Sequence, residues 1–430
     1  MTTSKPLIEI ERTVQRDART IAVDMATDDG RHALRTLIDD AIETWQSEAA
    51  LGVRPTPIAD PDAVARRAWR NLAEYGPLTE LLLDPDVWEI EINTPSDIFV
   101  KRHRGASGYH HETFHDDDHV LRTLTKLLDD SSGSHRKLDP TEGLQDAQLD
   151  DGSRLHIVHG DIARGGHCMV NIRRFTGVPF TRLQQLVSGG TLSPAAARCL
   201  AAAVRGGASV VFAGAPGSGK TTLLSCCLGE LDPSLRVVTA EEVFEIDAPL
   251  ANVASMQTRA ARSDRPGIDL RRLVSGFLRM APDVAVVGEV RDREALPLLL
   301  TLSSGVTGFT TVHAANARGA LSRLRFLAEL SDSARNLPHS ALTTLVSECI
   351  DLVVFSERTS SGPRVREILA VEELTTGPDS AAFTVTELFR TSSENSLRWT
   401  GAVPARLSHL LASQGIDLPD LLRCSTEVVR

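Results

Sequence analysis

The chain contains the sequence Gly214-Ala215-Pro216-Gly217-Ser218-Gly219-Lys220-Thr221, and Thr222 follows it. This stretch matches the pattern G-x-x-x-x-G-K-T and lies between an apolar run that ends at Ala213 and a helix-like run. In such a loop, glycines let backbone N–H groups turn toward phosphates, the lysine brings a positive charge to the terminal phosphates, and the threonine hydroxyl can join a Mg²⁺ shell. The stretch therefore predicts a strand, a phosphate-binding loop and a helix, with residues 214–222 holding a nucleoside triphosphate and Thr221 facing Mg²⁺.

Strand-like and helix-like runs alternate around this loop. Strands are expected at 210–213, 237–240, 253–257, 284–287 and 309–312, and helices at 194–205, 220–230, 270–280, 293–302 and 317–330. Buried strands that alternate with amphipathic helices imply an α/β fold with a mostly parallel sheet and helices on both faces. The phosphate loop then lies at the carboxyl edge of the sheet. A short β-rich stretch is expected between residues 352 and 388.

The residues before this domain predict a smaller one. Residues 1–60 are charged and helix-prone, and residues 61–175 combine helix-like runs near 64–74 and 119–128 with strand-like runs at 87–92, 98–100, 154–158 and 168–172. Glycine and proline punctuate the connection that follows. The expected order is a helical segment at 1–60, an α+β domain at 61–175, a linker at 176–192, the α/β domain at 193–390 and a C-terminal tail at 391–430.

Composition narrows the classes of function. The 430 residues carry a formal net charge of −11, so no overall positive field attracts DNA or anionic lipid, and we expect no direct nucleic-acid binding. No apolar run approaches the roughly 18 residues of a membrane span, and the N-terminus lacks the apolar core of a signal peptide. The six cysteines form no C-x-x-C pair, which argues against a zinc site or a disulfide framework. These features predict a cytoplasmic protein without a transmembrane segment.

Acidic side chains follow two of the expected strands. Glu289 ends the apolar run at 285–288 and is a candidate for orienting or activating water, although a surface glutamate after a strand would look the same. Glu241, Glu242 and Glu245 follow the strand at 237–240. Such crowding suits a metal or water site, but a solvated acidic turn also explains it.

Histidine and arginine side chains complete the set of candidates. His313 ends the strand at 309–312 and either faces the same sheet edge or is a satisfied core residue. Arg154, Arg173 and Arg174 lie in the expected α+β domain. They are either solvated or, if that domain closes over the nucleotide, neutralise charge on the γ-phosphate.

Four motifs then occur in a fixed order: GAPGSGKTT at 214–222, VTAEEVFEI at 238–246, LRMAPDVAVVGEVRD at 278–292 and TTVHAAN at 310–316. Their order resembles the Walker A, Asp-box, Walker B and His-box series of the type II/type IV secretion ATPases. Upstream, YGPL at 75–78, EIEIN at 89–93, DDGSR at 150–154 and NIRRF at 171–175 resemble the N-terminal domain of the CpaF/TadA branch.

The resemblance implies a RecA-like motor domain that uses ATP and Mg²⁺ in a homo-hexameric ring. Such a ring would lie at the inner face of the cell membrane and drive an inner-membrane platform protein in Tad/Flp-type pilus assembly or secretion. It further implies the following roles: Glu241, Glu242 and Glu245 in the Asp box, Glu289 in Walker B, His313 in the His box, Arg154 and Arg173 near phosphate, and Arg259 and Arg291 at basic positions near the motor site.

Three positions depart from the family pattern: Glu242 stands where aspartate is usual, Val306 where a first histidine is common, and Ala315 within the His box. A conjugation-type secretion ATPase shares the motifs and is the nearest alternative. A nucleic-acid motor, which the acidic balance disfavours, and a nucleotide-binding ring without catalysis are the alternatives from other classes.

Overall fold

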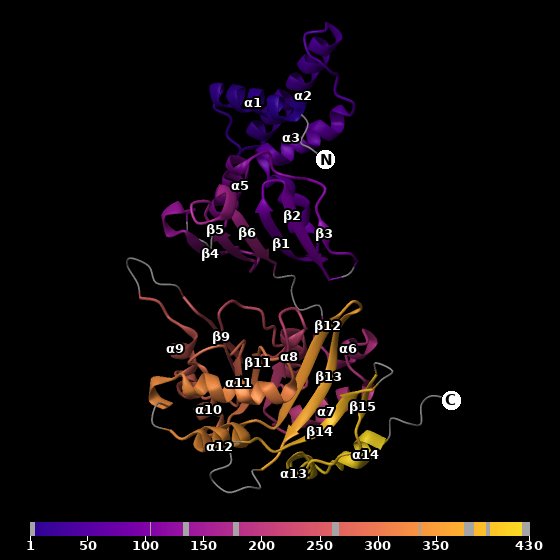
Figure 1. Cartoon of the computed structure of the whole chain (residues 1–430), viewed down its shortest axis with the longest axis vertical. Coiled ribbons are helices and arrows are strands. Elements are labelled where there is room, and N and C mark those ends of the chain that lie inside the picture. Colours follow the sequence, from indigo (N-terminus) through magenta and orange to yellow (C-terminus); the bar gives the residue numbers. More distant parts are fainter. Residues whose placement is uncertain are drawn as a thin grey trace, which may run out of the picture. The chain divides into compact units, whose positions relative to one another are not determined.

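The computed structural model describes residues 5–103, 105–131, 137–174, 180–259, 266–334, 337–373, 382–392 and 396–423. The chain folds as two compact units, Met1–Thr176 (unit 1) and Gly177–Arg430 (unit 2), drawn in Figure 1. Gly177 and Pro179, two of the residues that predict the linker, lie outside the described residues. Phe175 of the NIRRF motif also lies outside them.

Unit 1 begins with three helices, α1 (Lys5–Thr20), α2 (Asp28–Ala50) and α3 (Pro61–Ala73). Helix α2 begins where the Thr27 side chain accepts a hydrogen bond from the Gly30 N–H, which satisfies one of the free donors at a helix start. The three helices share one apolar cluster, which includes Ile10, Ile38 and Trp45. They therefore form a small helical bundle of their own.

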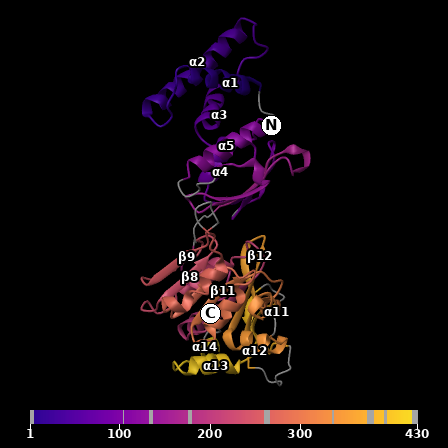
Figure 2. The same cartoon turned by 90° about the vertical axis from the view of Figure 1, so that its left-hand side faces the viewer.

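The rest of unit 1 is an antiparallel sheet with a covering helix. Its elements are η1 (Gly76–Leu78), α4 (Thr79–Leu83), β1 (Val87–Thr94), β2 (Asp97–Arg102), β3 (Gly108–Tyr109), α5 (Asp117–Asp129), η2 (Pro140–Glu142), β4 (Leu144–Gln148), β5 (Arg154–Val158), η3 (Arg164–Gly166) and β6 (Met169–Arg173). The strand order is β3-β2-β1-β6-β5-β4. Alternate strand residues such as Ile90 and Ile172 bury against Val120 and Leu124 of α5. Figure 2 shows the three N-terminal helices on the α5 side of this sheet.

Unit 2 is built on a nine-stranded sheet with the order β15-β14-β13-β12-β7-β11-β10-β8-β9. Its strands are β7 (Val210–Ala213), β8 (Val237–Glu241), β9 (Val253–Gln257), β10 (Val284–Val287), β11 (Thr307–Val312), β12 (Leu352–Thr359), β13 (Gly362–Val371), β14 (Val385–Thr391) and β15 (Leu397–Trp399). Strands β12, β7, β11, β10, β8 and β9 pair in parallel, and β13, β14 and β15 add antiparallel neighbours. The sheet is therefore mixed, with the predicted parallel strands at its centre and one edge.

Helices cover both faces of this sheet. They are α6 (Leu183–Ser188), α7 (Pro194–Arg205), α8 (Lys220–Leu228), α9 (Leu270–Val274), η4 (Phe277–Met280), α10 (Ala295–Leu302), α11 (Ala317–Glu329), η5 (Asp332–Ala334), α12 (His339–Cys349), α13 (Ala405–Ala412) and α14 (Leu418–Arg423). Phe212 of β7 joins the apolar cluster of α7, α8, α13 and α14, whereas its neighbour Val211 joins that of α9 to α12. Adjacent strand residues point to opposite faces, so β7 is buried on both sides, as its four apolar residues predict.

Three segments differ from expectation. The run at 270–280, predicted as one helix, is split into α9 and η4, because Ser275 and Gly276, both weak helix formers, lie between them. The expected linker at 176–192 carries α6, whose Leu183 and Leu186 are buried in the core of unit 2. The expected tail at 391–430 carries β15, α13 and α14, which pack on the same core.

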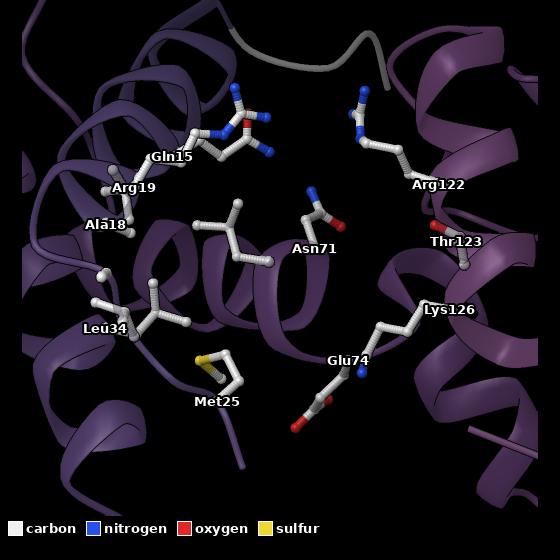
Figure 3. A pocket seen from close by; sticks show the side chains of 14 residues that line it. Gln15, Ala18, Arg19, Met25, Leu34, Asn71, Glu74, Arg122, Thr123 and Lys126 are labelled. Atoms are coloured by element: carbon white, nitrogen blue, oxygen red, sulfur yellow. The ribbon is translucent and has the colours of Figure 1, made fainter. Parts of the chain in front are cut away.

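Five cysteines, Cys168, Cys199, Cys226, Cys227 and Cys349, are unpaired and buried, as expected of small apolar side chains, and Cys424 lies outside the described residues. No helix in the described ranges is long and apolar enough to cross a membrane. A cavity of about 340 Å³ lies between α1, α2, α3 and α5. Figure 3 shows Arg19, Arg122 and Lys126 along its wall. Only unit 1 residues line this cavity, and none of the predicted site residues is among them.

Candidate nucleotide site

The loop between β7 and α8 has the backbone of a phosphate cradle. Gly214, Gly217 and Gly219 have φ angles of 151°, 72° and 84°, a region that residues with a side chain rarely adopt. In the described structure, the N–H groups of Ala215, Gly217 and Gly219 donate no hydrogen bond to other residues. The loop leads directly into the first turn of α8, where the helix dipole favours an anion. The arrangement can therefore accept phosphate oxygens.

Lys220 begins α8 and is almost fully buried. Its Nζ donates a hydrogen bond to the carbonyl of Ala215 at 2.9 Å, across the loop, and lies 3.5 Å from Nδ1 of His313. A buried ammonium group is stable only with nearby acceptors, and the loop carbonyl supplies one. The positive charge therefore lies within the loop itself.

Glu289 and His313 form the centre of the site. Nε2 of His313 lies 2.8 Å from Oε1 of Glu289, and Nδ1 lies 3.2 Å from the carbonyl oxygen of Gly214. Burial, the largest effect, raises the pKa of Glu289, but the hydrogen bond to His313 and the charges of Arg291, His313 and Lys220 together lower it below its usual value. Glu289 is therefore an ionised carboxylate near neutral pH, next to the phosphate loop.

Arg291 connects this centre to the Asp-box residue Glu242. Its Nη2 lies 2.6 Å from Oε2 of Glu242, and its Nε lies 3.6 Å from Oε1 of Glu289. The side chain of Glu242 thus reaches an arginine. Lys220, His313, Glu289, Arg291 and Glu242 form one continuous network of polar contacts.

The other two carboxylates of this segment, Glu241 and Glu245, lie at the end of β8 and in the turn that follows it. Glu241 is buried, and its Oε2 accepts the backbone N–H groups of Glu245 and Ile246 at 2.7 and 2.9 Å. This carboxylate therefore holds the turn after β8 in place. Glu245 is half-buried in the same turn.

The remaining loop residues divide by exposure. Ala215 and Pro216 are exposed, whereas Ser218 is buried with its hydroxyl directed into the protein. Thr221 and Thr222 are half-buried in the first turn of α8, and in the described structure neither hydroxyl has a hydrogen-bond partner. A hydroxyl oxygen beside a phosphate cradle is a suitable ligand for Mg²⁺, which prefers oxygen ligands. Thr221 therefore fits its predicted role.

The other predicted arginines lie in unit 1, except Arg259, which lies in unit 2. In unit 1, Arg154 of β5 and Arg173 of β6 are direct cross-strand partners, and Arg173 is exposed. In unit 2, Arg259 forms an isolated bridge with Ile268 and donates to the carbonyl of Pro266. Arg174 is used structurally, since it donates to backbone carbonyls of Leu81, Asp84 and Val87.

A glycine loop, a buried lysine and an ionised carboxylate at the carboxyl edge of a largely parallel sheet define a P-loop protein of the α/β class. Residues 71–357 match the family model for type II/IV secretion system proteins, and the chain belongs to this family, within the secretion ATPase superfamily. The predicted resemblance is thereby confirmed at the level of the superfamily.

Individual relatives share this region. The chain is 32% identical over 231 residues to the conjugal transfer protein TrbB of Rhizobium radiobacter, covering 50% of this chain and 68% of that protein. It is 29% identical over 313 residues to the type IV secretion system protein PtlH of Bordetella pertussis, covering 66% of this chain and 90% of that protein. Among solved structures, it is similar to the VirB11 ATPase of Brucella suis in complex with sulphate, with 25% identity, a TM-score of 0.36, and coverage of 68% of this chain and 94% of that one.

One part of the site has no signal in the sequence. Ser356 and Arg358 of β12 contact the phosphate loop, although they lie about 140 residues after it and in none of the four motifs. No local pattern marks them, because their position depends on the pairing of β12 with β7.

Proposed function

We propose that this protein hydrolyses ATP to ADP and phosphate and couples that reaction to movement of a pilus-assembly or secretion machine. The main observation is that Glu289, an ionised carboxylate, contacts His313, which in turn contacts Lys220 of the phosphate loop. That pairing of a phosphate-binding cation with a carboxylate that can orient water is what phosphoryl transfer requires.

In the proposed site, the N–H groups of Ala215, Gly217 and Gly219 bind phosphate oxygens, and Lys220 exchanges the Ala215 carbonyl for the terminal phosphates. Glu289 orients the attacking water and accepts its proton, while His313 and Arg291 keep the carboxylate ionised and fixed in position. Glu242 holds Arg291. Thr221 would hold Mg²⁺, which neutralises charge on the phosphates when bound.

Turnover of ATP by the purified protein tests this assignment. We expect Lys220→Ala to abolish nucleotide binding and Glu289→Gln to lower kcat by about 10²- to 10⁴-fold while ATP still binds. The matched control is Glu348→Gln, which makes the same change on an exposed residue of α12. We expect it to leave ATP binding and kcat unchanged. Unaltered turnover in both site variants would exclude this site as the source of the activity, and wild-type protein that binds ATP without turning it over would be a nucleotide-binding scaffold.

The arginines of unit 1 have a proposed role in coupling. We infer that Arg154 and Arg173, side by side on adjacent strands, approach the phosphates when unit 1 closes over the nucleotide in a homo-hexameric ring. Arg173→Ala should then lower turnover while leaving nucleotide affinity of the isolated chain almost unchanged. Equal turnover in wild type and variant, measured on the assembled ring, would exclude this role.

The machine itself is proposed to be a Tad/Flp-type pilus, driven through an inner-membrane platform protein from the cytoplasmic face, because the upstream motifs resemble the CpaF/TadA branch. A conjugation-type secretion system is the second candidate, since TrbB and PtlH carry the names of conjugal transfer and type IV secretion. Co-purification from membranes separates the two: recovery of a pilus platform supports the first, and recovery of a conjugation channel supports the second.

A further inference from the structure

Strand β12 continues past the point where β7 ends and the phosphate loop begins. The two strands pair in parallel from Leu352 opposite Val210 to Phe355 opposite Ala213. Since Ala213 is the last residue of β7, the next residue of β12, Ser356, lies alongside the loop. The β12–β13 register shifts between Phe355 and Ser356, and such bulges redirect side chains near functional sites.

Ser356 contacts the loop through its side chain and its backbone. Its Oγ lies 3.2 Å from Oγ of Ser218 and 3.4 Å from the carbonyl oxygen of Ala213, and both serines are wholly buried. A Cβ atom on Gly214 would lie 2.2 Å from the Ser356 carbonyl oxygen. The loop therefore begins pressed against β12, and only glycine fits there.

Two more residues of the β12–β13 hairpin reach the loop. Nη1 of Arg358 donates a hydrogen bond to the carbonyl of Gly217 at 3.3 Å. The ring of Pro363 lies 3.0 Å from the position that a Cβ on Gly219 would take. Together, Ser356, Arg358 and Pro363 are named the loop bracket.

We propose that the loop bracket holds the phosphate loop in its binding conformation before nucleotide arrives, so that Ser356 and Arg358 are positioning residues for nucleotide affinity. This inference rests on the proposed ATPase function. A glycine-rich loop has many accessible conformations, and ordering it on binding weakens affinity. The bracket contacts the loop at Gly214, Gly217, Ser218 and Gly219 and so removes much of that freedom in advance.

The first test measures affinity. We expect Ser356→Ala to weaken binding of a fluorescent, non-hydrolysable ATP analogue by about two- to tenfold, the effect of one lost hydrogen bond, and to raise KM for ATP with kcat within about twofold. Ser218→Ala removes only the Ser356–Ser218 contact and should weaken binding no more than Ser356→Ala, which also removes the contact with the Ala213 carbonyl. The double variant should bind no more weakly than Ser356→Ala, because the interaction between the two serines is counted once. Ser360→Ala, in the exposed turn of the hairpin, is the matched control. Wild-type affinity in Ser356→Ala, or a fall in kcat with KM unchanged, would overturn the proposal.

The second test is done without nucleotide, and its variant changes no residue of the buried core. Arg358→Gln changes a half-buried side chain. In the nucleotide-free protein we expect it to increase hydrogen exchange at Gly214 and Ser218, the loop amides that donate backbone hydrogen bonds, while peptides from β10 and β11 stay unchanged. Unchanged exchange in the loop would overturn the bracket. If instead wild type and Lys220→Ala both fail to bind the analogue, the ATPase assignment fails, and the exchange result still decides whether the bracket orders the loop.

Discussion

Replacing Arg406 with leucine should destabilise unit 2 by about 2–3 kcal/mol. Arg406 of α13 lies 2.8 Å from Oδ1 of Asp351, which precedes β12, and it also donates to the carbonyls of Ser347 and Glu348. The Arg406 and Asp351 side chains are 23% and 15% exposed, so leucine would leave a nearly buried carboxylate without its cation. Breaking a buried pair costs about 3–5 kcal/mol, and the remaining exposure reduces that figure.

The assay is urea unfolding followed by circular dichroism, where we expect the midpoint to fall by about 1 M. Asp351→Asn combined with Arg406→Leu should recover most of the loss, because the amide oxygen can still accept the Ser209 N–H that Asp351 accepts at 2.7 Å. Arg279→Leu, on an exposed arginine of η4, is the control. A wild-type midpoint for Arg406→Leu would refute the inference that α13 belongs to the fold.

The loss of stability caused by Arg406→Leu should depend on pH, and the structure predicts the direction of that dependence. Burial, the largest effect, raises the pKa of Asp351 above its usual value, although Arg406 and the Ser209 N–H act to lower it. A group whose folded pKa is raised contributes less stability as pH rises through that range, since the native state then binds more protons than the unfolded state. Loss of Arg406 raises this pKa further. The stability difference between variant and wild type should therefore shrink at acidic pH.

Three further outcomes are expected. Arg291→Gln removes one of the cations that lower the pKa of Glu289, so the acid limb of kcat/KM against pH should move to higher pH; an unchanged profile would contradict the role of Arg291. Gly214→Ala should abolish binding of the ATP analogue, because the new Cβ meets the Ser356 carbonyl at 2.2 Å, and normal affinity would show that the loop relaxes freely. Phe212→Ala removes a fully buried ring from the central strand and should cost about 3–5 kcal/mol in thermal unfolding, with a smaller loss expected only if the core collapses around the cavity.

Local patterns predicted the centre of unit 2 well. The apolar runs at 210–213 and 284–287 are strands β7 and β10, as expected, because fully buried parallel strands need an uninterrupted apolar sequence. Glu289 and His313 follow strand ends, and the structure brings them to one edge, since parallel strands end on the same side of a sheet.

Contacts that depend on distant pairing could not be predicted in this way. Arg291 reaches both Glu289 and Glu242, but the sequence shows only a basic residue after Walker B. Glu241 carries the same side chain as Glu242, yet its burial and its two backbone donors give it a structural contact instead. Helix α13 packs on the core through Leu407, Leu410 and Leu411, and this apolar signal is too short to distinguish a helix from a tail.

The order of the strands itself explains why the site is a network. Strands β7, β11, β10 and β8 are consecutive neighbours in the sheet and run in parallel. Their carboxyl ends therefore present, in this order, the phosphate loop, His313, Glu289 and Glu242. The observed contacts follow the same order, from Lys220 to His313, to Glu289, and through Arg291 to Glu242. Residues up to about 90 positions apart in sequence thus become neighbours because each follows a neighbouring strand, and β12, on the other side of β7, adds the loop bracket by the same geometry.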